Sequence, residues 1–162
     1  MSGPATAEEA QPEVADDEHL LQQLRMRDVP HDGADLAVEF DLTPRLTNPR
    51  GALQGGLVAT LVDVAAGRSI DDGADRTAAA TADLTIHYLR GVSVGPARAV
   101  SKVVRRGRTL AVANVEVFDM GTGQLCAVAT ASFALSSREP ASPATDVPPE
   151  RRTPGDQPNE EQ

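Results

Sequence analysis

Residues 55–70 carry the one long helical pattern of this chain, and most other regular stretches alternate apolar and polar residues as strands do. On a helical wheel of about 100° per residue, the apolar residues of 55–70 fall on one broad side. This side consists of Leu57, Val58, Leu61, Val62, Ala65 and Ser69. A lone helix with one apolar side must bury that side against the rest of the fold.

Strand-like alternation surrounds the helix. It covers residues 36–42 before the helix, and 78–89, 97–105, 109–119 and 125–135 after it. Short turn segments separate the later strands, and strands joined in this way form antiparallel sheets. We therefore predict an α+β fold in which an antiparallel sheet of about five strands wraps around one long central helix.

The two ends of the chain differ in composition from its middle. Residues 1–16 and 137–162 are rich in Pro, Ala, Ser and acidic residues, which is typical of disordered tails. One domain is predicted over 17–136, with a short helix at 17–27 that turns Leu20, Leu21 and Leu24 inward. The formal charge of −9 comes from residues 1–19 and 136–162, because residues 20–135 carry twelve acidic and twelve basic side chains. The net charge therefore indicates solubility rather than a basic partner.

Several classes of function are excluded by residue usage. Cys126 is the only cysteine and the three histidines are scattered, so neither a disulfide nor a metal site is predicted. Aromatic residues make up 2% of the chain, too few to stack nucleic-acid bases. No run of 18 apolar residues and no signal-length N-terminal stretch is present, so we expect a cytoplasmic protein without a membrane partner.

The helix face opposite the apolar side is unusually small. Asp63 lies there with Gly56, Thr60 and Gly67 around it. Glycine inside a helix costs about 1 kcal/mol relative to alanine, and its compensating advantage is close approach by a ligand or another backbone. The alternative is an exposed acid beside two tolerated glycines.

The start of the helix offers a second element. Gln54, Gly55 and Gly56 open it, and the first backbone N–H groups of a helix have no intrahelical partner. They sit at the positive end of the helix dipole, where an oxyanion can bind. The alternative is an ordinary helix start that faces water.

The segment 48–63 resembles the signature of hotdog-fold acyl-CoA thioesterases, nearest to the phenylacetic acid degradation branch. Members of that family have Asn or Gln, then G-x-x-H-G-G, a helix, and Asp or Glu. Residues 81–90 resemble the strand that follows in the family, 103–109 its R-x-G-[RK]-[TS] hairpin, and 126–133 its last strand. The resemblance implies a hotdog fold over about 33–135.

The resemblance also implies roles. Asp63 corresponds to the catalytic carboxylate, which acts as nucleophile or as general base. Gly55 corresponds to the oxyanion-hole residue, Asn48 to a loop amide that positions the thioester or the water, and Thr81 to a residue that steadies the water or the carboxylate. The substrate-binding residues expected from the resemblance together with the residue pattern are Gln54, Gly56, Thr60, Arg90, Arg105, Arg106, Gly107 and Arg108.

The chain departs from the family at Gln54, where histidine is usual. Glutamine exchanges hydrogen bonds but cannot shuttle a proton. For the coenzyme, residues 84–115 carry six basic side chains and no acid, and guanidinium groups suit phosphates. The alternative is a solvated basic hairpin.

Two chains are needed for the chemistry. Gly55 and Asp63 lie about 12 Å apart along one helix, at 1.5 Å per residue. One thioester carbon must lie within roughly 3 Å of both the nucleophile and the oxyanion donors. A two-fold dimer can bring Asp63 of one protomer to Gly55 and Asn48 of the other. We therefore expect a homodimer or a dimer of dimers (a homotetramer).

Taken as a whole, the sequence predicts a thioester hydrolase that converts an acyl-CoA to the free acid and coenzyme A. No cofactor is expected, since coenzyme A is part of the substrate. One alternative is a non-catalytic acyl-CoA sensor or carrier, which Gln54 favours. Another is a hotdog hydratase or dehydratase, although that chemistry calls for an Asp/His pair.

Overall fold

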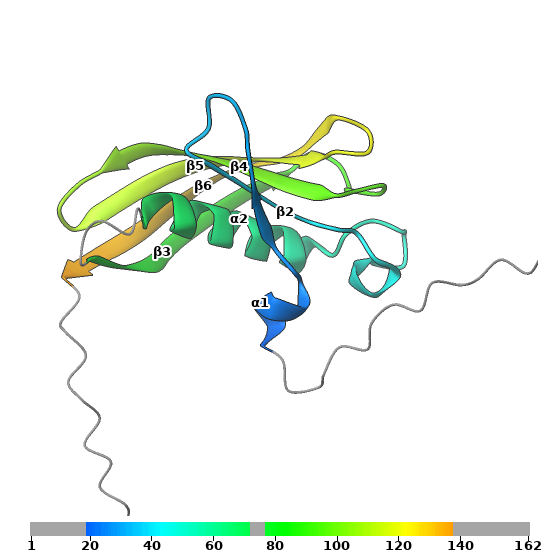
Figure 1. The fold of residues 1–162 in the computed structure, drawn as a ribbon, viewed down its shortest axis with the longest axis horizontal. Coiled ribbons are helices and arrows are strands. Elements are labelled where there is room, and N and C mark those ends of the chain that lie inside the picture. Colours follow the sequence, from blue (N-terminus) through cyan, green and yellow to red (C-terminus); the bar gives the residue numbers. More distant parts are fainter. Residues whose placement is uncertain (1–18, 72–76, 138–162) are drawn as a thin grey trace, which may run out of the picture.

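The computed structural model describes residues 19–71 and 77–137 (Figure 1). The elements in chain order are α1 (Leu20–Gln23), β1 (Arg27–Val29), β2 (Leu36–Phe40), the 3-10 helix η1 (Pro44–Leu46), α2 (Gly55–Ile70), β3 (Thr77–Tyr88), β4 (Ala97–Arg106), β5 (Leu110–Asp119) and β6 (Gln124–Ser137). The six strands described form one antiparallel sheet in the order β1-β2-β4-β5-β6-β3. Helix α2 lies along one face of this sheet. The predicted α+β class is confirmed.

The predicted bounds of the helix match α2, and the four strands after it lie within two residues of prediction. The sequence does not predict β1. A strand of three residues is too short to show alternation. Strand β1 forms because it pairs with β2, which lies further along the chain. Arg27 lies opposite Glu39 of β2, and their side chains form a salt bridge of 2.8 Å.

The helix predicted at 17–27 is present but much shorter, and residues 17 and 18 lie outside the described residues. Helix α1 has only four residues, and among the three leucines only Leu24 is buried, while Leu20 and Leu21 are 56% and 38% exposed. The chain leaves the helix at Arg25, which has a φ of 48°, and then turns into β1. Pairing with β2 therefore overrides the local helical pattern.

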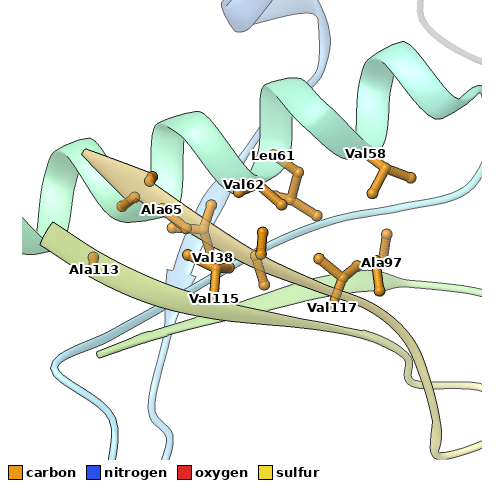
Figure 2. Packing of buried hydrophobic residues seen from close by; sticks show 14 of the residues in the cluster. Val38, Val58, Leu61, Val62, Ala65, Ala97, Ala113, Val115 and Val117 are labelled. Carbon is orange, nitrogen blue, oxygen red and sulfur yellow. The ribbon is translucent and has the colours of Figure 1, made fainter. Parts of the chain in front are cut away.

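The core lies between α2 and the sheet. Val58, Leu61, Val62 and Ala65 are buried as predicted, and Ala66 and Ile70 join them. Figure 2 shows the first four of these helix side chains pointing toward small residues of the strands, labelled there as Val38, Ala97, Ala113, Val115 and Val117. Small side chains on the sheet let the helix approach closely, which explains how a core with few aromatic residues packs. Cys126 is buried in this core, as the sequence predicts.

The two helix glycines serve different purposes. At Gly67 a Cβ atom would lie 3.3 Å from the ring of Phe133, so packing within the chain limits this position to a small residue. At Gly56 a Cβ atom would have nothing within 4 Å. Only Gly56 therefore leaves open space outside the chain, and the prediction of a small face open to another backbone does not hold for Gly67.

Strand β3 ends the sheet. It pairs with β6 on one side, and its other side has no strand partner among the described residues. It is twelve residues long and contains a bulge between Thr81 and Asp83. A long edge strand of this kind offers unpaired backbone groups to a further strand.

The predicted tails fall almost wholly outside the described residues. Of the C-terminal tail only Ser137 is described, and it pairs with Thr77 at the end of β6. Within 19–71 and 77–137, no helix has both the length and the apolar character needed to cross a membrane.

Candidate active site

The amino end of α2 presents two backbone donors. Gln54 is the N-cap residue, and its carbonyl oxygen accepts from the amides of Leu57 at 2.9 Å and Val58 at 3.2 Å. No side chain caps the helix. In the part of the chain that the structure describes, the Gly55 and Gly56 amides have no acceptor. These two N–H groups are therefore available to an oxyanion at the positive end of the helix.

The loop before the helix is held by Asn48. Its Oδ1 accepts from the amide of Arg50 at 2.9 Å and from that of Ala52 at 3.3 Å. The backbone N–H of Asn48 donates to the carbonyl of Ala52 at 2.7 Å. The side-chain oxygen is thus engaged within the loop, and the Nδ2 group is the part of Asn48 left to contact a ligand.

Tyr88 joins β3 to the start of the helix. Its hydroxyl donates to the carbonyl of Gly55 at 2.9 Å, and its ring atoms lie 3.7–3.8 Å from where a Cβ at Gly55 would be. The sequence does not single out Tyr88. The one available signal is that it is the only tyrosine, at the end of the strand that carries Thr81.

A pocket of about 240 Å³ opens beside the helix start. It brings three predicted residues together, namely Asn48, Gly55 and Arg90, and adds Tyr88. The remaining lining residues are Ala52, Leu53, Val58, Leu89, Gly91 and Val92. Asp63 is not among them, so this pocket holds the predicted oxyanion donors without the predicted acid.

Gln54 and Thr60 turn toward the chain's own backbone. The Nε2 of Gln54 donates weakly to the carbonyl of Thr47 at 3.4 Å, and the side chain is exposed. The Thr60 hydroxyl donates to the carbonyl of Gly56 at 3.0 Å. Each side chain therefore remains near the predicted site while making a local bond.

Asp63 lies two helical turns further on, half-buried, and faces β3. The Thr81 hydroxyl donates to Oδ1 of Asp63 at 2.7 Å. Thr81 begins the bulge of β3, and a bulge redirects side chains locally. The structure thus places the predicted acid and the predicted threonine together, with Oδ2 of Asp63 left for a water molecule or a substrate.

The predicted coenzyme-binding hairpin lies at the other end of α2. Arg105 and Arg108 are exposed. Gly107 lies in the turn, where its backbone N–H donates to the carbonyl of Leu110 at 2.8 Å. Arg106 donates to the carbonyl of Ile70, the last residue of the helix. This bond gives Arg106 a structural partner that the sequence does not predict.

Asp119 is a buried carboxylate that the sequence also does not single out. It accepts from the amides of Ser93 and Gly95 at 2.8 Å, Val94 at 3.0 Å and Gly121 at 3.1 Å. Burial would raise the pKa of Asp119, but these four bonds outweigh it and hold the pKa below its ordinary value. The loop that Asp119 holds follows β3 and borders the pocket. In this loop the carbonyl of Val92 accepts a hydrogen bond from the backbone N–H of Leu53, one residue before Gln54.

Within residues 19–71 and 77–137, no three His, Cys, Asp or Glu side chains are grouped to hold a metal ion. The described site offers a carboxylate, hydroxyl groups and amide donors. Such a set can attack a carbonyl carbon and stabilise the oxyanion that forms.

The sequence profile of the thioesterase superfamily matches residues 50–126. A Saccharolobus solfataricus protein that carries an esterase name is 30% identical over 101 residues, which make up 60% of this chain and 69% of that protein. The chain belongs to the thioesterase superfamily. Acyl-coenzyme A thioesterase 13 of Mus musculus is 30% identical over 93 residues, covering 57% of this chain and 66% of the mouse protein. This chain thus spans about two thirds of the length of these relatives.

Solved structures of thioesterase superfamily type share the fold. A thioesterase of Haemophilus influenzae superposes with a TM-score of 0.68 at 16% identity, over 75% of this chain and 85% of that one. A Bacillus halodurans protein solved with coenzyme A is 31% identical, with a TM-score of 0.56 over 62% of this chain and 66% of that one. The predicted hotdog fold is confirmed.

In this member of the thioesterase superfamily the predicted residues fall into three groups. Asn48, Gly55 and Arg90 meet at the amino end of α2, and Asp63 meets Thr81 at its middle. The basic hairpin adjoins Ile70, roughly 22 Å from Gly55 along the helix axis.

Proposed function

We propose that the protein is an acyl-CoA thioesterase whose active sites are shared between the two protomers of a homodimer. The observation that carries this proposal is that both groups of site residues lie along β3, the edge strand. Asp63 contacts Thr81 near the middle of β3, and Gly55 contacts Tyr88 at its last residue. Both groups therefore lie beside the edge strand of the sheet.

The edge strand suggests how two protomers associate. A two-fold axis perpendicular to the sheet would pair β3 with its copy in antiparallel fashion and set the two α2 helices side by side in opposite directions. Centred between Leu84 and Thr85, this pairing places Thr81 of one protomer opposite Tyr88 of the other. Asp63 then approaches the Gly55 and Gly56 amides of its partner, and the open space at Gly56 accommodates the approach.

In this site the thioester oxygen lies at the Gly55 and Gly56 amides of one protomer. Asp63 of the other protomer attacks the carbonyl carbon as nucleophile, or removes a proton from the water that attacks it. The Thr81 hydroxyl fixes Oδ1 of Asp63, so Oδ2 does the chemistry. The C–S bond breaks and coenzyme A leaves as the thiol. In the general-base route the proton that Asp63 takes from the attacking water passes to the sulfur. In the nucleophile route water supplies that proton and then hydrolyses the mixed anhydride on Asp63, which releases the acid. Gln54 cannot carry a proton in either route.

The phosphates of coenzyme A have exposed basic partners. Arg105 and Arg108 lie on the hairpin beside the carboxyl end of α2, which the antiparallel pairing brings near the partner's pocket. Arg90 lines that pocket and donates to Oε1 of Gln124 at 3.1 Å. The Bacillus halodurans relative with coenzyme A supports this class of ligand.

Thiol release from a panel of aryl, short and medium acyl-CoAs tests the activity. We expect turnover that Asp63→Ala abolishes while the dimer stays folded. Mixing the Asp63→Ala and Asn48→Ala variants tests the shared site, because each random heterodimer regains one intact site and about a quarter of the wild-type activity should return. Full turnover by a monomer, or by Asp63→Ala, would refute the proposal.

One observation favours a second candidate function. Gln54 replaces the usual histidine, and its side chain is directed to the carbonyl of Thr47. A non-catalytic acyl-CoA sensor or carrier would need the donors and the pocket without proton transfer. Calorimetric binding of an acyl-CoA that is never hydrolysed would support this function over hydrolysis.

A further inference from the structure

Tyr88 contacts the helix start in a way that core packing does not require. Its side chain is 55% exposed, yet its ring lies against Gly55 and its hydroxyl donates to the Gly55 carbonyl at 2.9 Å. The backbone at Tyr88 is held by β6, where Tyr88 pairs with Ala127. The backbone amides of the next two residues, Leu89 and Arg90, both donate to the carbonyl of Cys126. A rigid strand end thus holds the phenol against the first peptide of the helix.

The bonded carbonyl belongs to a particular peptide group. The C=O of Gly55 and the N–H of Gly56 are the two ends of one peptide. A hydrogen bond to the carbonyl polarises that peptide and strengthens its N–H as a donor. Since the Gly56 amide has no acceptor among the described residues, the gain is directed to whatever binds at the helix start.

We propose that Tyr88 is a positioning residue that orients and polarises the Gly55–Gly56 peptide for oxyanion binding. The catalytic part of this inference rests on the proposed thioesterase function. The polarisation of the peptide does not, and it can be measured on the protein without substrate.

The variant that tests the proposal is Tyr88→Phe, which keeps the ring and removes only the hydroxyl. If polarisation adds about a fifth to an oxyanion donor, kcat should fall about threefold while KM stays within about twofold. The control is Thr130→Val, which also deletes one hydroxyl from an exposed hydrogen bond, to Asn114 at 3.1 Å, and Thr130 does not line the pocket at the helix start. The control should leave kcat unchanged.

Amide NMR separates this proposal from the proposed function. In Tyr88→Phe the ¹⁵N resonance of Gly56 should move upfield more than that of any other helix amide, because its own peptide carbonyl loses a donor. An unchanged Gly56 resonance, or an unchanged kcat in an active enzyme, overturns the role of Tyr88. A wild type that never releases thiol defeats the proposed function, and the Gly56 shift still decides whether Tyr88 polarises the peptide.

Discussion

The hydroxyl of Thr81 lies 2.7 Å from Oδ1 of Asp63, joining the edge strand to the middle of the central helix. The bond fixes one carboxylate oxygen, and the other has no hydrogen-bond partner among the described residues. Within 19–71 and 77–137, only Thr81 of β3 forms a hydrogen bond to the Asp63 side chain. The orientation of the proposed catalytic acid therefore depends on one hydroxyl group.

Replacing Thr81 tests that dependence. Thr81→Val keeps the shape and removes the donor, so we expect kcat to fall about tenfold, the worth of one hydrogen bond to a charged group. Thr81→Ser restores a hydroxyl and should return most of the activity. Steady-state kinetics and thermal unfolding of both variants give the comparison. Equal activity of the valine and serine variants would show that the bond has no part in catalysis.

The arginines of the hairpin should separate by role. Arg105→Ala and Arg108→Ala remove exposed charges proposed to bind phosphate, so KM for acyl-CoA should rise severalfold, and more so at low salt. Lys102→Ala is the matched control, because Lys102 lies opposite Asn114 on the sheet face away from α2. Arg106→Ala should instead lower the melting temperature, since Arg106 bonds to the helix-end carbonyl of Ile70. A KM change equal to that of Lys102→Ala would argue against a coenzyme site at the hairpin.

The periodic parts of the fold can be read from the sequence. The apolar side of α2 and the alternation of the long strands are repeated often enough to set their bounds within about two residues. Strand β1 and the edge position of β3 cannot be read in this way. Both depend on pairing between distant segments, Arg27 with Glu39 in the first case and Thr77 with Ser137 in the second.

The residues of the candidate site also differ in how far the sequence predicts them. Asn48, Gly55 and Asp63 are recognisable because they lie in one short segment with a fixed spacing. The sequence does not reveal the contacts of Tyr88, Asp119 and Arg106, because the partners of these side chains are backbone groups. Three of the four amides that bind Asp119 lie 24–26 residues before it in the loop, and no residue type marks them in advance.

The two helix glycines give opposite expectations for stability. Gly56→Ala adds a Cβ with nothing within 4 Å, so the free energy of unfolding should rise by up to about 1 kcal/mol from helix propensity. Gly67→Ala places its Cβ 3.3 Å from the Phe133 ring, and strain should cancel that gain. Denaturant unfolding measures both. If the partner protomer occupies the space beside Gly56, Gly56→Ala should also lower activity, whereas retained activity would place the interface elsewhere.

Asp119 should make the stability of the protein sensitive to acid. Four hydrogen bonds from backbone amides hold the pKa of Asp119 in the folded state below its pKa in the unfolded chain. The stabilising contribution of Asp119 is therefore complete above the unfolded pKa of about 4. It is lost as the pH falls through the folded pKa. Asp119→Asn removes the charge and sets an amide against backbone donors, so it should cost about 3 kcal/mol at neutral pH. It should also flatten the fall in stability below pH 4 that is expected of the wild type. Glu116→Gln, an exposed change three residues earlier on β5, should do neither. Urea unfolding from pH 3 to 7 measures all three proteins, and an acid-stable wild type whose profile matches that of Asp119→Asn would remove Asp119 as the anchor of the loop beside the pocket.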